Sequence, residues 1–292
     1  MRVREVRADR LGDVSGEDWV DLTRRPYVDR ETAWVPVSEG FAFDCEIPER
    51  HAYTGRGYFI LGDVAVVHGD RPTEKEVEGI VRFRHPRGVL WIESLAGVTR
   101  TPVTEVLWGS AGEVCHREEG YAYFLDPGRV MFAQGNRDEK MRMARLIRED
   151  PAGARVADMF AGIGYFTIPM AGSGVQVHAM EINPVACAYL ERNIAANGLA
   201  GRVQVSCGDC RTHLSGIYDR VMMGHFDAVT MLPAVFSHVR TGSVIHVHSI
   251  GDVSEAIRES ARGAGFSPSI QVHKVKKYRP HAWHIVQDVT LS

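Results

Sequence analysis

The feature that most constrains the fold is a regular alternation of apolar strand patterns with amphipathic helix patterns, which begins at Asp138. Helices that separate successive strands carry the chain back across a sheet, so the strands run parallel and the helices cover both faces. The sequence therefore predicts an α/β, Rossmann-like domain. The predicted helices are 138–148, 165–171, 184–197, 225–239 and 253–264, and the predicted strands are 155–159, 175–180, 203–206, 243–248, 269–275 and 284–291.

The first part of the chain has a different pattern, in which short strands dominate. Residues 58–67 are typical of two strands around a Gly62-Asp63 turn, and Thr73 with Glu76 forms a capping box that starts a helix over 73–82. Further strands are predicted over 89–95, 104–108 and 121–125. We therefore expect a smaller N-terminal α+β domain over 1–115 and the Rossmann-like domain over 116–292, while residues 1–50 match no pattern that we can assign.

Composition narrows the cellular setting. The formal net charge of −3 gives no support to general nucleic-acid binding, although it leaves room for a local basic face. The five cysteines are an odd and sparse set, unlike a secreted disulfide scaffold, and the charged N-terminus lacks the apolar segment of a signal peptide. No apolar run approaches the roughly 20 residues of a membrane span. These features predict a cytoplasmic protein.

The strongest local signal is the glycine turn Asp158–Phe166, which follows an apolar strand and opens a helix. Gly162 and Gly164 let the backbone turn sharply and approach a ligand closely. Glu181 ends the next strand, where a carboxylate can accept both hydroxyls of a ribose, and Asp209 follows the third strand, where an adenine amino group could donate to it. Two glycines alone lack the spacing of dinucleotide sites, but with these acids they predict a nucleoside-containing cofactor.

Asp158–Phe166, Glu181–Pro184 and the helix Ala188–Asn197 resemble the class I S-adenosylmethionine-dependent transferases, and more narrowly the family that modifies guanosine 37 of tRNA. One branch of that family methylates N1 of the guanosine. The other moves the 3-amino-3-carboxypropyl group of S-adenosylmethionine onto a tricyclic guanosine derivative in wybutosine synthesis. The resemblance covers most of the chain beyond about Tyr58. It implies a class I methyltransferase sheet, with S-adenosylmethionine as cofactor and tRNA(Phe) as partner.

Three segments resemble the archaeal-type wybutosine branch. Phe132–Ala144 is similar to its Phe-Ser-x-Gly-Asn pattern ahead of a Glu and a basic cluster, with Ala133 in place of the serine. Met223-Gly224-His225 is similar to its Met-Gly-Tyr, whereas the methylating branch has Asn-Leu-Pro there. Lys274–Asp288 is similar to its tail Lys-x-Lys-x-Tyr-x-Pro-x-x-Trp-His. We therefore expect aminocarboxypropyl transfer. The alternatives are N1-methylation of guanosine 37, a non-catalytic cofactor-dependent RNA-binding protein and a small-molecule methyltransferase.

The resemblance also implies roles for single residues. His225, which replaces the Tyr of Met-Gly-Tyr, is the candidate catalytic residue, although no general base stands out. Lys140 or Arg142 is expected to hold the methionine carboxylate, together with the backbone around Gln134–Asn136. The expected contacts to the anticodon-stem region of tRNA are Lys274, Lys276, Lys277, Tyr278, Arg279 and Trp283. The expected cofactor contacts are Phe132, Ala133, Gln134, Gly135, Asn136, Lys140, Arg142, Asp158, Phe160, Ala161, Gly162, Gly164, Glu181, Ile182, Asn183, Asp209, Cys210, Met223 and Gly224.

Two further spacings have an ordinary interpretation. Cys207 and Cys210 could suggest redox or zinc chemistry, but there is no second pair, so we favour two cysteines packed near the nucleotide loop. Cys210 also stands where the family often has Asn. His246 and His248 alternate on a strand and must face one side of the sheet. We interpret them as lining the cleft rather than binding metal, and we expect no metal.

Overall fold

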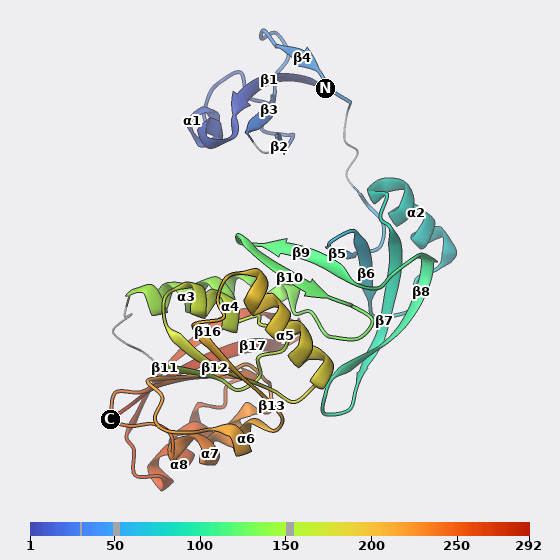
Figure 1. Ribbon diagram of the computed structural model, residues 1–292. Helices are drawn as coiled ribbons and strands as arrows, with labels where there is room; N and C mark the ends of the chain where they lie inside the picture. The colour runs from blue at the N-terminus through green and yellow to red at the C-terminus, as the bar shows by residue number, and fades with distance from the viewer. Residues whose placement is uncertain (30, 49–52, 150–154) are drawn as a thin grey trace. The chain divides into compact units, whose positions relative to one another are not determined.

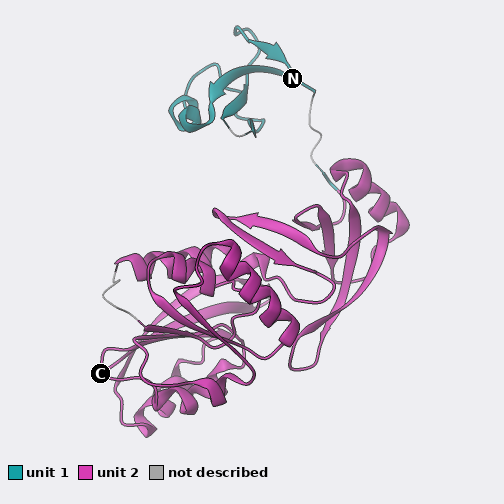
Figure 2. Ribbon diagram, in the orientation of Figure 1, with its two compact units in different colours: residues 1–54 teal, residues 55–292 magenta. Residues whose placement is uncertain are grey.

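The computed structural model describes residues 1–29, 31–48, 53–149 and 155–292. These residues form two compact units, Met1–Thr54 and Gly55–Ser292, which Figure 2 colours separately. The domain boundary expected after residue 115 falls inside the second unit, within strand β9 (Val114–Glu118). Within the described residues, no helix is long and apolar enough to cross a membrane.

The first unit is a small antiparallel sheet with strand order β2-β3-β1-β4. Its strands are β1 (Arg2–Arg7), β2 (Tyr27–Asp29), β3 (Thr32–Pro36) and β4 (Cys45–Glu46), and the short helices η1 (Ala8–Arg10) and α1 (Leu11–Val14) follow β1. Val3, Ala33 and Val35 are at most 1% exposed. Most other positions of these short strands are partly or fully exposed, which explains why residues 1–50 carry so little periodicity.

The second unit begins with a four-stranded sheet of order β5-β6-β7-β8. Its elements are β5 (Phe59–Leu61), β6 (Val64–His68), α2 (Glu74–Arg84), β7 (Gly88–Ala96) and β8 (Thr101–Gly109). Gly62, at a φ of +57°, makes the predicted turn between β5 and β6. The capping box is confirmed, because Thr73 and Glu76 each accept a hydrogen bond from the other's backbone amide. β9 and β10 (Tyr121–Leu125) then form a separate hairpin.

The Rossmann-like part is built on a seven-stranded sheet. Its strands are β11 (Arg155–Asp158), β12 (Gln176–Glu181), β13 (Val203–Cys207), β14 (Arg220–Met223), β15 (Val244–Ile250), β16 (Pro268–Arg279) and β17 (Ala282–Leu291). Its helices are α3 (Arg137–Glu149), α4 (Thr167–Gly172), α5 (Pro184–Ala196), α6 (Cys210–His213), α7 (Leu232–Phe236) and α8 (Ser254–Gly263). The strand order is β13-β12-β11-β14-β15-β17-β16. Helices α3 to α5 cover one face and α6 to α8 the other, as predicted (Figure 1).

The sheet departs from the expected parallel arrangement at one edge. β11 to β15 pair in parallel, but β17 runs antiparallel to both β15 and β16. Pro280 and His281 alone join β16 to β17, and so short a connection forces neighbouring strands to be antiparallel. Two further details differ. Strand β14 fills a stretch where we predicted none, and the helix predicted over 225–239 is only the turn η3 (Ala228–Met231) followed by α7.

Two apolar cores lie against the main sheet. One includes Val156 and Val177 of the sheet with Met143 of α3, and continues without a break into Leu90 of the smaller sheet and Leu125 of β10. The other packs the opposite face of the sheet against α7 and α8. The first core therefore joins the smaller sheet to the Rossmann-like part, so that residues 55–292 form a single unit.

Candidate functional site

The carboxyl ends of parallel strands meet at one edge of a sheet, and ligands of open α/β folds bind there. At this edge the structure brings together the glycine turn after β11, Glu181 at the end of β12, Asp209 after β13 and Met223 at the end of β14. The strand order β13-β12-β11-β14 makes these segments neighbours. The structure thus assembles the constellation that the sequence predicted.

The glycine turn has a backbone shape that favours glycine. The φ angle is +57° at Gly162 and +105° at Gly164. A Cβ on Gly164 would stand 2.7 Å from Cδ1 of Ile168, so both the backbone and the packing exclude a larger residue. The amide of Gly162 donates to the Glu181 carboxylate at 2.7 Å, which ties the turn to the end of β12.

Glu181 is fixed by two backbone amides. Its Oε2 accepts from Gly162 and its Oε1 from Asn183, both at 2.7 Å. Burial raises the pKa of this carboxyl, whereas the two amide donors favour the charged form. Each oxygen keeps a further lone pair, so the carboxylate can still accept both hydroxyls of a ribose. Beside it, Ile182 is 43% exposed and offers an apolar surface on which a purine can pack.

Asp158 lies beneath the turn. Its side chain is fully buried and accepts a hydrogen bond from the hydroxyl of Thr167 at 2.7 Å. Burial raises the pKa of Asp158 to about 6. Because no part of the residue is exposed, we interpret it as a support for the turn, while the neighbouring Phe160 is partly exposed and available to a ligand.

Tyr165 fastens a second loop, 131–136, to the glycine turn. Its hydroxyl accepts from the amide of Ala133 at 2.8 Å and donates to the carbonyl of Met131 at 2.6 Å. Phe132 is buried edge-on against the Tyr165 ring, with 5.0 Å between the ring centroids. The loop ends in the turn η2 (Gln134–Asn136). Sequence reasoning overlooked Tyr165, although it lies inside the glycine motif.

Lys140, an expected carboxylate ligand, is already paired. It is 1% exposed, and its ammonium forms an ion pair with Glu118 of β9. Burial lowers the pKa of Lys140, and the Glu118 carboxylate opposes that shift. The rings of Tyr123, Phe132 and Tyr165 surround the ammonium at 5.3 to 5.7 Å from their centroids. Lys140 thus stabilises the packing of β9 and α3 behind the loop.

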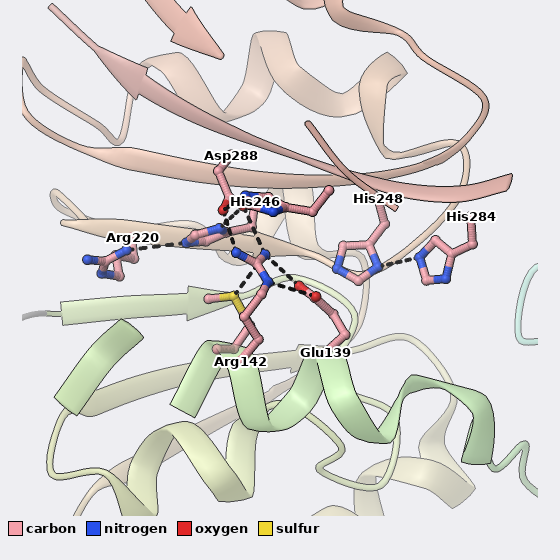
Figure 3. Close-up of polar contacts among 9 residues, drawn as sticks. Glu139, Arg142, Arg220, His246, His248, His284 and Asp288 are labelled. Carbon is pink, nitrogen blue, oxygen red and sulfur yellow. Dashed lines mark hydrogen bonds and ion pairs between the residues drawn. The ribbon is translucent and has the colours of Figure 1, made fainter. Parts of the chain in front are cut away.

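Arg142 is also paired, in a second buried cluster (Figure 3). Its guanidinium donates to Glu139 at 2.7 and 2.8 Å and to Asp288 at 2.6 and 3.2 Å. Burial alone would raise the pKa of Asp288, but His246 and Arg142 lower it overall. Because Lys140 and Arg142 both have carboxylate partners inside the protein, this geometry does not support the expectation that either holds a cofactor carboxylate.

The two histidines of β15 face the same side of the sheet, as their alternation predicted (Figure 3). Both are 1% exposed, so they are core residues and do not line an open cleft. Nδ1 of His246 lies 2.6 Å from Asp288, and Nδ1 of His248 lies 2.9 Å from Nε2 of His284. Burial lowers the pKa of His284 to about 4. In the part of the chain that the structure describes, no group of three or more potential ligands is arranged for a metal ion.

The end of β14 brings His225 to the glycine turn. The His225 ring stacks on Phe160 with 5.3 Å between the centroids, and a Cβ on Gly224 would contact the ring of Phe166. Burial, helped by the charge of Arg100, lowers the pKa of His225 and favours the neutral ring. The amide of Asp227 donates to Nδ1 at 3.2 Å, so the neutral ring carries its proton on Nε2. His225 therefore offers a hydrogen-bond donor rather than a base.

Asp209 and the cysteines near it differ in part from expectation. The Asp209 carboxylate caps α6 through the amide of Arg211 at 3.0 Å and also pairs with the Arg211 guanidinium. Cys210 is buried, which raises the pKa of its thiol to about 11. Cys207 is bonded to Cys187 of α5 in a disulfide. From the sequence we assigned Cys207 no partner, because Cys187 is 20 positions away and comes beside it only when α5 packs on β13.

The basic tail, residues 274–288, lies in the β16–β17 hairpin, and its side chains differ in their exposure. Lys277, Tyr278 and Arg279 are exposed, as is Trp283 on β17. Lys274 is exposed as well and places its ammonium 5.3 Å from the Trp283 ring centroid. Lys276 is the one partly buried residue among the six expected tRNA contacts. Its Nζ would lie 2.5 Å from a Cβ on Gly135, so it points to the loop 131–136.

A family model and a curated protein both match this chain, and they point to the same family. Residues 114–274 match the TRM5/TYW2 methyltransferase domain. The chain is 34% identical over 246 residues to the tRNA(Phe) (4-demethylwyosine(37)-C(7)) aminocarboxypropyltransferase of Methanocaldococcus jannaschii, a match that covers 80% of this chain and 97% of that protein.

Solved structures agree with the sequence match. The structure of M. jannaschii TYW2 in complex with AdoMet superposes with a TM-score of 0.64 at 30% identity, covering 81% of this chain and 99% of that one. The structure of Trm5b from Pyrococcus abyssi superposes with a TM-score of 0.74 at 25% identity, covering 99% of both chains. The expected fold class is thereby confirmed.

Proposed function

This chain belongs to the TRM5/TYW2 methyltransferase family, and from that premise we propose that it is an aminocarboxypropyltransferase. It transfers the 3-amino-3-carboxypropyl group from S-adenosylmethionine to the tricyclic modified guanosine at position 37 of tRNA(Phe). The observation that carries this assignment is the 34% identity to the M. jannaschii aminocarboxypropyltransferase, which extends over 97% of that enzyme. The segments around Phe132 and Met223 that favoured this branch lie at the same edge of the sheet.

The residues at this edge fit S-adenosylmethionine. The glycine turn has the sharp backbone shape that lets a ligand approach the main chain, and Glu181 presents a fixed carboxylate for the ribose. Ile182 and Phe160 offer partly exposed apolar surface for the adenine. We propose that Asp209, which caps α6 after β13, also accepts the adenine amino group. We assign the remaining expected contacts of loop 131–136 and of the β14 end to the amino-acid arm.

The reaction is decided by how the arm is oriented. S-adenosylmethionine supplies a positive sulfonium with three electrophilic carbons, so attack at the γ-carbon transfers the arm and leaves methylthioadenosine. The chain's contribution is to hold that carbon toward the acceptor, which is catalysis by proximity and alignment. Tyr165 fixes the loop that we assign to the arm, and Nε2 of His225 carries the ring's donor. We propose that His225 hydrogen-bonds the acceptor base.

The tRNA is proposed to bind over the exposed part of the basic tail. Lys274, Lys277 and Arg279 supply cations for phosphates, and Tyr278 and Trp283 are 49% and 39% exposed, suited to stacking on an unpaired base near the anticodon stem. The N-terminal part of the chain, residues 1–115, is proposed to help position the tRNA. The protein is proposed to act in the cytoplasm.

One observation favours a second candidate, N1-methylation of guanosine 37. The Trm5b structure covers 99% of this chain, whereas the TYW2 structure covers 81%. Against methylation, this chain has Met223-Gly224-His225 at the place where the methylating branch has Asn-Leu-Pro. We therefore keep methylation as the alternative that the experiment must separate.

The by-product of a single turnover separates the candidates. The full chain is incubated with S-adenosylmethionine and tRNA(Phe) that carries either the tricyclic base or unmodified guanosine 37, and the nucleoside products are quantified by mass spectrometry. We expect methylthioadenosine with the tricyclic substrate. S-adenosylhomocysteine with the unmodified substrate would assign methylation instead. If neither product forms although the cofactor binds tightly, the protein would be a non-catalytic RNA-binding protein.

A further inference from the structure

Lys276 is a cation in an unusual setting. It lies on β16 at a break in the β16–β17 register, between Lys274 and Lys276, that reorients this part of the strand. Its ammonium is so close to Gly135 that a Cβ there would stand 2.5 Å from Nζ. Lys276 is partly buried, and among the described residues no carboxylate forms an ion pair with it. Such a charge is costly unless an anion completes the site.

The backbone that Lys276 touches belongs to the cofactor site. Gly135 lies in loop 131–136, which Tyr165 fastens to the glycine turn through two hydrogen bonds. The next residue, Asn136, has a buried side-chain Oδ1 without a hydrogen-bond partner in the described structure. Buried polar atoms are nearly always paired. An unpaired acceptor on the residue that follows the lysine's contact therefore indicates that a ligand with both a negative and a positive group completes the site.

The other cations near this loop are not available. Lys140 is paired with Glu118, and Arg142 with Glu139 and Asp288. By contrast, burial lowers the pKa of Lys276 without an opposing acid, and the charge of Lys276 helps to lower the pKa of His284. Both effects are those expected of an ammonium that lacks its counter-ion.

We infer that Lys276 binds the carboxylate of the amino-acid arm of S-adenosylmethionine and that Asn136 Oδ1 accepts a hydrogen bond from the ammonium of the same arm. The inference rests on the proposed function only in requiring S-adenosylmethionine as the ligand. It moves Lys276 from the expected tRNA surface into the cofactor site. It also gives the role expected of Lys140 or Arg142 to a residue far away in sequence.

Equilibrium binding without tRNA tests this assignment. Calorimetry of the full-length Lys276→Met variant uses three ligands: S-adenosylmethionine, decarboxylated S-adenosylmethionine, which lacks only the carboxylate, and methylthioadenosine, which lacks the whole arm. We expect S-adenosylmethionine to bind about 10- to 100-fold more weakly, as loss of a charge-assisted hydrogen bond implies. The two other ligands should change by less than about 2-fold. Lys277→Met, on the exposed neighbour, is the matched control and should change none of the three affinities.

A second variant tests whether a loss of affinity comes from the missing charge or from a damaged fold. Lys276→Arg keeps the charge and should recover part of the affinity for S-adenosylmethionine. Unchanged binding of S-adenosylmethionine by Lys276→Met, with weaker binding of tRNA, would return the residue to the RNA surface and overturn the inference. An equal loss for all three ligands in both variants would overturn it as well. Because no transfer is measured, a failure here is distinct from a failure of the proposed activity.

Discussion

Asp158 is a fully buried carboxyl beneath the glycine turn. Its carboxyl has no exposed surface, and a single strong hydrogen bond, from Thr167 at 2.7 Å, does not replace lost water. Burial therefore raises the pKa from 3.8 to about 6. Between pH 3.8 and about 6, the native state keeps the proton on Asp158, whereas the unfolded state has released it. The contribution of Asp158 to stability is thus present below about pH 4 and is lost as the pH rises through about 6.

The prediction is that Asp158→Asn stabilises the ligand-free protein in a pH-dependent way. An amide has no charge to desolvate, so the variant should melt roughly 2–4 °C above the wild type at pH 7.5 and within error of it near pH 4. Thermal unfolding of both proteins from pH 4 to 8 measures the difference. Asp70→Asn, at an exposed position, is the control. A difference that is constant over this range would mean that the Asp158 charge is not the cause.

At the scale of elements, helix α5 does more than cover the sheet. Asn193 accepts from the amide of Phe124 at 2.7 Å and donates to the carbonyls of Phe124 and Ile163 at 3.1 and 3.0 Å. Asn197, one turn later, makes the equivalent pair of bonds to Ala122 at 2.9 and 2.8 Å. The two amides thus pair with the open edge of β10 as a neighbouring strand would, and they join that edge to the glycine turn.

We expect Asn193→Asp to destabilise the second unit strongly. The change keeps the shape but replaces two donated hydrogen bonds by contact between a buried carboxylate and two carbonyls. Breaking such a network costs about 2–4 kcal/mol in the free energy of unfolding, and S-adenosylmethionine should bind more weakly because Ile163 lies in the turn. Denaturant unfolding and calorimetry measure the two effects. Glu191→Gln, an isosteric change on the exposed face of α5, should alter neither, and equal behaviour of the two variants would refute this role for Asn193.

On the scale of the whole molecule, the two units have independent cores. Both apolar clusters of the second unit consist of residues from position 59 onward, and the first unit buries Val3 and Val35 in its own sheet. The surface of the first unit includes Arg2 over the ring of Phe43 and Arg4 over the ring of Trp19, at 4.9 and 4.5 Å. Cations beside aromatic rings suit contact with RNA.

A chain that starts at Gly55 should therefore fold and bind S-adenosylmethionine within about 2-fold of the full-length protein, because no core residue is lost. Its affinity for tRNA(Phe) should fall by about 10-fold or more if the first unit supplies phosphate contacts. Calorimetry measures the cofactor and filter binding at fixed salt measures the tRNA. Undiminished tRNA affinity would mean that the first unit does not position the tRNA. Loss of cofactor binding would contradict independent folding of the second unit.

Local patterns determined a large part of this protein. The alternation from Asp138, the glycine turn and Glu181 were sufficient to predict the α/β sheet and a nucleoside cofactor, because periodicity and turn geometry depend on residues close together in the chain. The same dependence accounts for the capping box at Thr73. The segments around Phe132 and Met223 resembled one branch of a family, and that resemblance predicted aminocarboxypropyl transfer.

Only the tertiary structure decided which charged residues are available to a ligand. Lys140 and Lys276 both occur in motifs with a basic character, but the partner of Lys140 is Glu118 on another strand, and Lys276 has no carboxylate partner among the described residues. Cys187 pairs with Cys207 for the same reason, since α5 packs beside β13. Pairing of charges and thiols depends on contacts between distant segments. The sequence therefore predicted where the cofactor binds, and the fold decided which side chains remain available to hold it.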